Sequence, residues 1–326
     1  MPQTSAILGL GAHVPPKVLT NFDLEKMMDT TDEWIRTRTG IRERHIADKS
    51  QCASDLGVLA AREALAQAGL SAGQIELIIV ATSTPDMIFP STGCGIQEKL
   101  GARCGAFDVS AACSGFTYAV SIADAYVRGG IYRNVLVVGA ELLSRFVDWK
   151  DRSTCVLFGD GAGAAVIGPS VDGHGILSTY LGSDGSKADL LKIPGGGSMF
   201  PPSSETLAQG LHYLKMQGSE IFKIAVRTME DAVHEVVSRA GLAVSDIACL
   251  IPHQANMRIL SAVAERLEIP LEKVYVNVEK YGNMSSASTV VALYEAALSG
   301  KIKKGDYVVL VAFGGGLTWG SALIKW

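Results

Sequence analysis

The unit that decides the fold is written once as Phe107-Asp108-Val109-Ser110-Ala111-Ala112-Cys113 and again as Val276-Asn277-Val278-Glu279-Lys280-Tyr281-Gly282-Asn283. Each copy is predicted to lead from a strand through a turn into an apolar-periodic helix, and the two runs end at Gly130 and Gly300. Cys113 and Asn283 stand 170 positions apart, as do the two glycines. A single offset at both ends predicts one unit present twice.

The duplication extends upstream, where Ala68-Gly69-Leu70 is matched by Ala240-Gly241-Leu242. We predict an α/β fold built from two pseudo-duplicated halves, residues 1–172 with the cysteine and residues 173–326 with a histidine and the asparagine. Two copies packed about a pseudo-twofold axis bring matching loops together at the centre. Cys113 and Asn283 are therefore candidates for one pocket at that junction.

Composition excludes several classes of protein. The chain has 326 residues, 48% of them hydrophobic and 19% charged, with a net charge of −4, which is typical of a globular enzyme and gives no general attraction to nucleic acid or anionic membrane. Its six cysteines form no CxxC pair and no zinc-like cluster with histidine. Because the N-terminus lacks a basic region and no apolar run approaches membrane-spanning length, we expect a cytoplasmic protein with no metal site.

Short apolar strands alternate with amphipathic helices along the chain. We expect each half to end in antiparallel strands, the first in a hairpin formed by 154–158 and 164–167 across a glycine-rich turn. The Gly-, Ser- and Pro-rich stretch 182–210 is predicted to be a surface loop without chemistry. The remaining elements are predicted as helices at 54–68, 92–100, 218–240 and 256–267 and strands at 6–10, 77–81, 135–138, 248–251, 307–312 and 321–325.

Cys113 follows a strand and a small-residue turn at the start of a helix. Unpaired backbone N–H groups and the helix dipole favour an anion there, so we expect a thiolate nucleophile. Ala111 and Ala112 before it and Ser114 after it leave space for a substrate. The alternative is a structural buried cysteine, which is the usual fate of this residue type.

His253 and Asn283 are the other candidates for catalysis. His253 follows the apolar strand 248–251, at the mouth of an α/β sheet, where a neutral imidazole can donate to a developing oxyanion or carry protons. The Asn283 amide is uncharged at every pH and can support an enolate oxygen. The alternatives are a helix-capping or core histidine and an asparagine N-cap. Phe313-Gly314-Gly315-Gly316-Leu317 follows a strand and suits an oxyanion hole.

Several long motifs carry a family resemblance: Thr31-Asp32-Glu33-Trp34-Ile35, the Cys113 motif, Phe158-Gly159-Asp160-Gly161-Ala162-Gly163, His253-Gln254-Ala255-Asn256, Gly282-Asn283 and Leu317-Thr318-Trp319-Gly320-Ser321-Ala322. In this order they resemble the thiolase-type condensing enzymes. Elongating synthases of that superfamily pair cysteine with two histidines and thiolases bring a second cysteine. The set of Cys113, His253 and Asn283 is similar to the catalytic set of the initiating branch, the β-ketoacyl-acyl carrier protein synthase III family. The resemblance covers nearly the whole chain.

The resemblance implies a thiolase-like fold with αβαβα layers and a decarboxylative Claisen condensation that starts fatty acid synthesis. Cys113 would be acylated by a short acyl-CoA, malonyl-acyl carrier protein would lose CO2 while His253 and Asn283 stabilise the enolate, and the carbanion would attack the acyl-cysteine. The backbone N–H groups of Cys113 and Gly315 would hold the tetrahedral oxyanion. No cofactor is implied, since the CoA thioester is itself a substrate.

The resemblance also implies binding residues for each partner of a homodimer. Coenzyme A would be held by Trp34, Arg38, Arg152, Phe222 and Asn256. The acyl pocket would be bounded by Leu157, by Phe313 and by Phe89 from the partner subunit. An acidic carrier protein would dock on Lys223, Arg258 and Arg266.

This sequence departs from the family pattern in four places: Glu265 stands where relatives carry lysine, Ser114 and Ser286 where alanine is usual, and Met284 where threonine is usual. Two other functions stay open. One is a relative that joins acyl chains in a secondary-metabolite or quinolone pathway, and the other is a non-catalytic acyl-binding subunit.

Overall fold

Two stacked β-sheets form the frame of the molecule. The computed structural model describes residues 4–170 and 172–326. The first sheet has the order β1-β7-β6-β4-β5 and the second the order β8-β13-β12-β11. The strands of the first sheet are β1 (Ser5–His13), β4 (Leu77–Ala81), β5 (Gly105–Val109), β6 (Val135–Leu142) and β7 (Asp160–Pro169). Those of the second sheet are β8 (Gly175–Ser183), β11 (Ile247–Pro252), β12 (Tyr307–Gly314) and β13 (Thr318–Lys325).

The two sheets repeat each other in order and direction. In the first, β4 runs parallel to β5 and β6, and β7 runs antiparallel to both β6 and β1. In the second, β11 is parallel to β12, and β13 is antiparallel to both β12 and β8. The place of β5 is taken by a single parallel bridge between Leu250 and Val274. The repeat in the sequence therefore corresponds to a repeated supersecondary unit, and the last strand of this unit is reduced to one bridge in the second copy.

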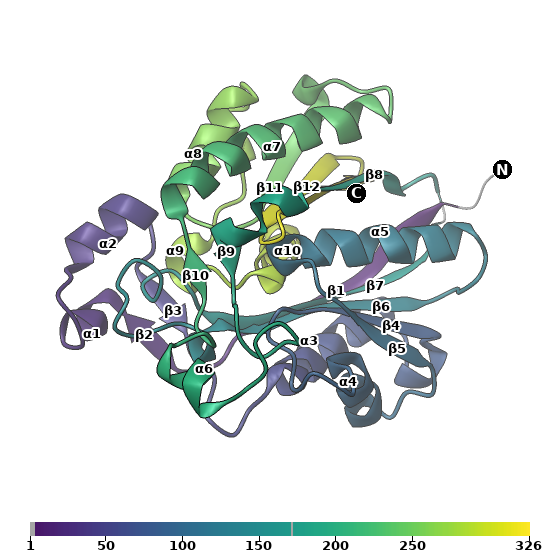
Figure 1. Ribbon diagram of the computed structural model, residues 1–326. Coiled ribbons are helices and arrows are strands. Elements are labelled where there is room, and N and C mark those ends of the chain that lie inside the picture. The colour runs from purple at the N-terminus through teal and green to yellow at the C-terminus, as the bar shows by residue number, and fades with distance from the viewer. Residues whose placement is uncertain (1–3, 171) are drawn as a thin grey trace.

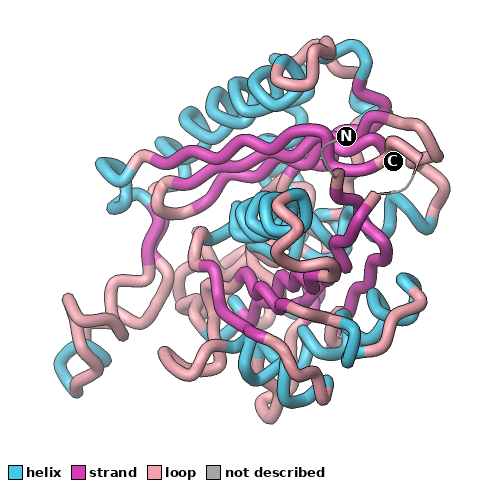
Figure 2. The backbone as a smooth tube through the Cα atoms, turned by 90° about the vertical axis from the view of Figure 1, so that its right-hand side faces the viewer, coloured by secondary structure: helices cyan, strands magenta, loops and turns pink. Residues whose placement is uncertain are grey.

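Helices cover both sheets and separate them, giving five layers (Figures 1 and 2). α3 (Ala53–Ala68) and α4 (Thr92–Leu100) pack on the outer face of the first sheet, and α7 (Gly218–Ser238) packs on the outer face of the second, with α8 (Met257–Arg266) beside it. α5 (Gly115–Arg128) and α10 (Ser286–Leu298) lie between the sheets and contact both. The predicted α/β fold with two repeated halves and αβαβα layers is thereby confirmed.

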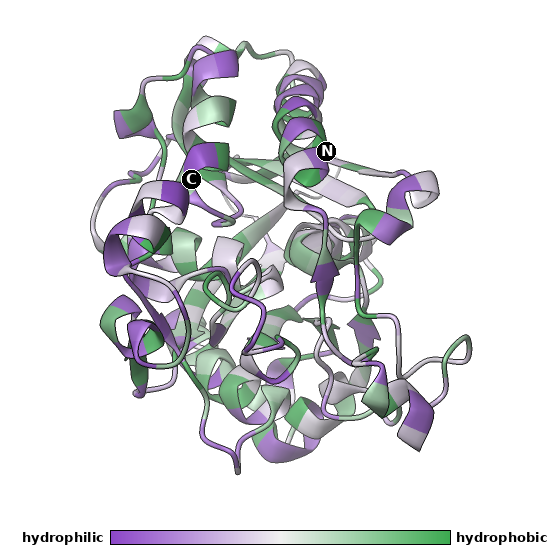
Figure 3. Ribbon diagram, turned by 60° about the vertical axis from the view of Figure 1, so that its left-hand side comes forward, coloured by the Kyte–Doolittle hydropathy of each residue, from purple (hydrophilic) through white to green (hydrophobic). Residues whose placement is uncertain are grey.

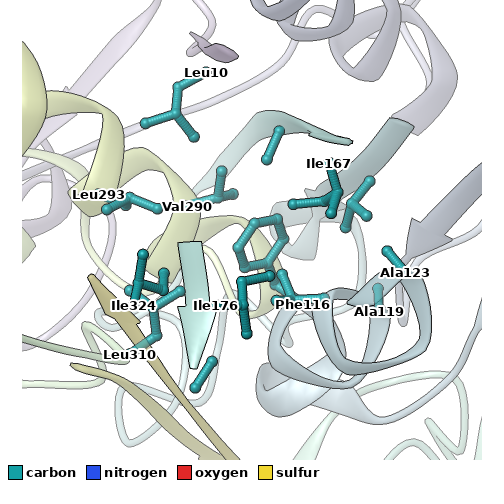
Figure 4. Packing of buried hydrophobic residues seen from close by; sticks show 14 of the residues in the cluster. Leu10, Phe116, Ala119, Ala123, Ile167, Ile176, Val290, Leu293, Leu310 and Ile324 are labelled. Carbon is teal, nitrogen blue, oxygen red and sulfur yellow. The ribbon is translucent and has the colours of Figure 1, made fainter. Parts of the chain in front are cut away.

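The central layer holds the main hydrophobic core. Leu10, Phe116, Ile167, Val290 and Leu310 come from five different elements of the two halves and are buried together (Figure 4). Gly163 of β7 permits this packing, because a Cβ there would overlap the Val290 side chain of α10. Along the outer helices, hydrophilic and hydrophobic residues alternate (Figure 3), which matches helices with one face on a sheet and one in water.

Smaller elements complete the chain: α1 (Asn21–Glu25), α2 (Asp32–Thr39), α6 (Ser204–Ala208), α9 (Val278–Tyr281), the pair β2 (Val18–Thr20) and β3 (Glu43–His45), and the pair β9 (Leu191–Lys192) and β10 (Lys215–Met216). Within the described ranges, no helix combines the length and the apolar character that a membrane crossing needs. The predicted boundary between residues 172 and 173 lies beside residue 171, which is outside the described residues.

Two predictions about local structure were wrong. Residues 154–157 form turns and Phe158 forms only a single bridge to Asn283, so there is no hairpin strand here. The Asp151 carboxylate accepts hydrogen bonds from Ser153 and Thr154 and tightens the chain there. β7 instead pairs with β6 and β1. The stretch 182–210 is also more than a surface loop, since it contains β9, whose Leu191 and Lys192 line a cavity of about 660 Å³.

Candidate active site

The Cys113 loop is a sharp turn between β5 and α5. Cys113 lies in a 3₁₀ turn, Ala112–Ser114, directly before α5, and Ala112 has a φ of 46°, in the left-handed region that residues with a side chain seldom adopt. The Ser114 hydroxyl donates either to the Ala111 carbonyl at 2.7 Å or to Thr318 Oγ1 at 2.8 Å. The serine that replaces the usual alanine therefore fastens this turn to the start of β13.

Burial decides the protonation of the nucleophile. Cys113 is 7% exposed, and its burial, supported by the nearby Glu141 charge, raises the pKa of the thiol to about 12, although a hydrogen bond with the Ser285 side chain opposes this. The predicted thiolate was therefore wrong for the resting site, because loss of water outweighs the start of the helix. Cys113 rests as a thiol and must lose its proton during the reaction.

His253 is placed by the end of β11. Its backbone N–H donates to the Val311 carbonyl at 2.7 Å, which extends the parallel pairing of β11 and β12 and turns the imidazole toward the cavity. Burial lowers the pKa of His253 to about 3, so the ring is neutral near pH 7. Among the described residues Nδ1 is buried without a hydrogen-bond partner. The helix-capping alternative does not hold, because the cap of α8 is Asn256.

Asn283 is held by the first half of the chain. Its backbone N–H donates to the Leu157 carbonyl at 2.8 Å, and its carbonyl accepts from the Gly159 N–H at 3.0 Å. The side-chain Oδ1 accepts from the Ser285 N–H at 2.8 Å. The Nδ2 group is thus the one left to donate, and it has no acceptor within the described ranges. Asn283 does not cap α10, whose N-cap is Ser285.

The glycine-rich loop after β12 closes over the nucleophile. Gly314 touches Cys113 so closely that a Cβ on it would lie 2.5 Å from the Cys113 nitrogen. Thr318 Oγ1 lies 2.9 Å from the Ala111 carbonyl and 3.0 Å from the Gly315 carbonyl, and its hydroxyl can donate to either of them. Gly315 and Cys113 therefore lie side by side at the cavity wall, where their backbone N–H groups suit an oxyanion.

One cavity of about 660 Å³ joins these groups to most of the predicted binding residues. Cys113, His253 and Asn283 share its wall, as do Leu157 and Phe313. Its lining also includes the predicted residues Arg38, Phe222, Asn256, Lys223, Arg258 and Gly315. Phe89 is not part of the lining; it is 83% exposed on the loop that follows β4.

Trp34 and two arginines form a cluster beside this cavity. The guanidinium carbons of Arg38 and Arg152 each lie 5.1 Å from the Trp34 ring centroid. Arg152 also donates to the Asp29 carbonyl at 2.7 Å. Because Arg38 lines the cavity, the cluster stands at its rim, where flat cationic and aromatic faces can bind a flat heterocycle.

The three predicted docking cations differ in how far they are neutralised. Arg258 lies 5.4 Å from the Phe222 ring, and within the described residues it forms no ion pair. Lys223 pairs with Glu220 at 3.1 Å across one helical turn. Arg266 is bound to Glu230 and lines a separate, smaller depression. Of these three cations, Arg258 is therefore the one that no carboxylate neutralises within the described residues.

Comparison with known proteins identifies the family. Residues 107–185 match the model of 3-oxoacyl-[acyl-carrier-protein] synthase III, and residues 237–326 match the model of its C-terminal part. A β-ketoacyl-[acyl-carrier-protein] synthase III of Caldanaerobacter subterraneus subsp. tengcongensis is 56% identical over 323 residues, which are 99% of this chain and 98% of the relative. The chain belongs to the β-ketoacyl-acyl carrier protein synthase III family. It is a condensing acyltransferase of this family, as its sequence predicts.

Solved structures of synthase III proteins agree with this assignment. The synthase III of Aquifex aeolicus is 50% identical with a TM-score of 0.92, covering 99% of this chain and 100% of that chain. A priming β-ketosynthase from the R1128 polyketide pathway is 38% identical with a TM-score of 0.90, covering 99% and 97%. The fold is thus shared with a synthase III protein and with a priming β-ketosynthase of a polyketide pathway.

Sequence reasoning missed two polar residues of this synthase III site. Glu141 lies fully buried at the end of β6, and Ser285 lines the cavity between Asn283 and α10. The sequence did contain a signal for Glu141, because a carboxylate near the end of the apolar strand Val135–Leu142 is unusual. Ser285 offered no such signal, since its φ of 47° is visible only in the structure.

Proposed function

We propose that this chain catalyses the decarboxylative condensation of a short acyl-CoA with malonyl-acyl carrier protein, the first condensation of fatty acid synthesis. The observation that carries the proposal is the single cavity in which a thiol, a neutral imidazole and an amide with a free N–H group meet. These are a nucleophile and two uncharged donors. A nucleophile and two donors are what an acyl transfer followed by enolate formation requires.

In the first half-reaction the Cys113 sulfur attacks the thioester carbonyl of acyl-CoA. The N–H groups of Cys113 and Gly315 hold the oxyanion, each worth roughly 3–4 kcal/mol in comparable sites. The C–S bond to coenzyme A breaks and the acyl group stays on Cys113. Trp34 and Arg152 hold the adenine, with Arg38 near the phosphates and with Phe222 and Asn256 along the pantetheine arm.

In the second half-reaction malonyl-acyl carrier protein loses CO2. His253 and Asn283 donate to the enolate oxygen, and the carbanion attacks the acyl-Cys113 carbonyl, expelling the sulfur. Because His253 is neutral, its donation needs the tautomer with hydrogen on Nε2, and the buried Nδ1 then carries no proton. No step calls for a metal or a redox cofactor.

The carrier protein docks beside the cavity mouth, with Arg258 as the main contact and Lys223 and Arg266 weakened by their acidic partners. Glu265, exposed one residue before Arg266, weakens that side further. The active form is a cytoplasmic homodimer. Met87, Ile88 and Phe89 support the dimer, because this apolar loop is exposed in one subunit and Phe89 can complete the partner's acyl pocket.

A synthase of secondary metabolism is the second candidate, and the structural likeness to a priming ketosynthase of a polyketide pathway favours it specifically. Acyl-donor preference and the accepted carrier protein separate the two. A non-catalytic acyl-binding subunit is disfavoured, because a binding protein has no use for a thiol that faces two enolate donors.

The test is to separate the half-reactions in His253→Ala. We expect this variant to form acyl-enzyme from acetyl-CoA, detected by intact mass, while its release of CO2 from malonyl-acyl carrier protein falls about 10²- to 10³-fold. Decarboxylation at the wild-type rate would contradict the proposed role of His253. Absence of any acyl-Cys113 in the wild type, with acetyl-CoA or with longer and branched acyl-CoAs, would contradict the proposed function itself.

A further inference from the structure

Two hydroxyl groups stand where the Cys113 turn meets the glycine-rich loop. The Ser114 hydroxyl lies 2.7 Å from the Ala111 carbonyl and 2.8 Å from Thr318 Oγ1. The Thr318 hydroxyl lies 2.9 Å from the same Ala111 carbonyl and 3.0 Å from the Gly315 carbonyl. Ser114 is fully buried, so water does not replace these contacts. The two hydroxyls therefore form one hydrogen-bonded chain from the turn to the loop.

The number of hydroxyl hydrogens matches the number of carbonyls only when residue 114 is serine. When Ser114 donates to Ala111, the Thr318 hydrogen is available to Gly315. With alanine at position 114, the single Thr318 hydrogen would be divided between Ala111 at 2.9 Å and Gly315 at 3.0 Å. The Ala111 carbonyl also accepts from the backbone N–H of residue 114 at 3.2 Å, and that bond is the same in both cases. What the serine changes is therefore the bond that reaches Gly315.

Gly315 depends on this bond more than its neighbours in the loop do. Gly314 pairs with Thr318 at the facing ends of β12 and β13. Leu317 exchanges backbone hydrogen bonds with Asp184 at 2.8 and 3.0 Å. Gly315 takes part in neither pairing, and glycine has the widest backbone freedom of any residue. Within the described ranges its carbonyl is held by the Thr318 hydroxyl, and its N–H donates to no acceptor and is available to a ligand.

We propose that Ser114 is a positioning residue of the oxyanion hole. By occupying the Ala111 carbonyl, it directs the Thr318 hydroxyl to Gly315. The Gly315 N–H is thereby fixed beside the N–H of Cys113. The inference rests on the acyl transfer proposed above. Ser114 is fully buried and is not among the described residues that line the cavity, so it acts through Thr318 and touches no substrate.

The oxyanion hole acts in only some of the chemical steps. It holds the oxyanion when Cys113 is acylated and again when the carbanion attacks the acyl group. The loss of CO2 between these steps develops charge on the enolate oxygen, which His253 and Asn283 hold. A change at Ser114 should therefore slow acylation far more than it slows decarboxylation. General damage to the structure would slow both.

The experiment measures two rates: single-turnover acylation by saturating acetyl-CoA, followed by intact mass, and CO2 release from malonyl-acyl carrier protein without acyl-CoA. In Ser114→Ala, which restores the usual alanine, acylation should slow about 2- to 10-fold, the equivalent of one net hydrogen bond. In Thr318→Val it should slow about 10- to 100-fold, which is below the cost of losing a whole oxyanion donor. Thr318→Ser keeps the hydroxyl and should recover most of the rate. CO2 release should fall far less than acylation in each variant.

A double variant and a distant serine complete the experiment. Because Ser114 acts through Thr318, adding Ser114→Ala to Thr318→Val should slow acylation by less than about twofold further. Ser321→Ala is the matched control, since the Ser321 hydroxyl is equally buried in β13 but donates to the Ala232 carbonyl of α7 at 2.8 Å. This control should lose stability in denaturant and still acylate at the wild-type rate.

Acylation by Ser114→Ala as fast as by Ser321→Ala would overturn the proposal, and so would independent effects of the two changes in the double variant. Equal losses of acylation and CO2 release would indicate general damage and would overturn it as well. If Thr318→Val does not fold, Ser114→Ala measured against Ser321→Ala decides the matter. All of these results leave the proposed function standing. Absence of acyl-Cys113 in the wild type, with acetyl-CoA or with longer and branched acyl-CoAs, would overturn that function and this inference with it.

Discussion

Replacing Gly314 by alanine tests the contact that places the nucleophile. The new methyl carbon would lie 2.5 Å from the Cys113 nitrogen, 3.1 Å from Cys113 Cβ and 3.2 Å from Ala112 Cβ, whereas ordinary contacts begin at 3.4 Å. Two of these neighbours are Cβ atoms fixed to the backbone and one is the backbone itself, so none can rotate away. The turn must therefore move by roughly 1 Å, a displacement that can cost about 100-fold in a reaction that depends on orientation.

We expect Gly314→Ala to acylate from acetyl-CoA about 100-fold more slowly than the wild type, measured by intact mass in single turnovers. Overpacking should also lower the free energy of unfolding by about 1–3 kcal/mol, measured in denaturant. Gly197→Ala is the control, since a Cβ there meets nothing within 4 Å and its φ lies outside the left-handed region. Wild-type acylation by Gly314→Ala, with Gly197→Ala behaving alike, would refute the close packing of this loop on Cys113.

Three further predictions concern accessibility, charge and protonation. Iodoacetamide should label the exposed Cys94 well before Cys113, whose thiol is buried with a raised pKa; peptide mapping that finds Cys113 first would contradict the buried thiol. Arg258→Ala should raise KM for carrier protein severalfold at low salt and less at high salt, while Arg266→Ala, whose charge is already paired, should do so less; equal effects would contradict this ranking. Burial lowers the pKa of His253 to about 3, so below pH 6.5 this histidine takes up a proton in the unfolded chain but not in the folded one. The free energy of unfolding should therefore fall by up to about 1.4 kcal/mol per pH unit as the pH decreases. Denaturant unfolding of His253→Gln should show a weaker pH dependence, and an unchanged dependence would contradict the buried neutral imidazole.

The sequence was sufficient to predict the frame of the fold and that Cys113, His253 and Asn283 share one cavity. Repeated spacing around Cys113 and Asn283 indicated two related α/β units, and the strands at 77–81 and 247–252 lie where their apolar runs predict. These features are local, because a continuous apolar run between turn signals specifies a buried strand without reference to the rest of the chain. The resemblance then supplied the binding residues, most of which share one cavity.

The errors concern interactions between distant segments. The thiolate prediction considered only the start of α5, whereas the protonation of Cys113 depends on how completely β12, β13 and α10 exclude water from it. Residues 154–158 have strand-like composition, yet their partners are the side chain of Asp151 and the backbone of Asn283. Glu141 was missed because its burial and its hydrogen bonds with the Thr84 and Ser286 hydroxyls depend on segments that are distant in the sequence.

The layer shared by α5 and α10 has a consequence for the engineering of the chain. Each of these helices shields the sheet of the other half as well as its own, so a single copy of the unit would expose an apolar face to water. We therefore expect a single copy to need a partner that covers this face. The two halves, when produced as separate fragments, should accordingly associate on mixing and restore activity.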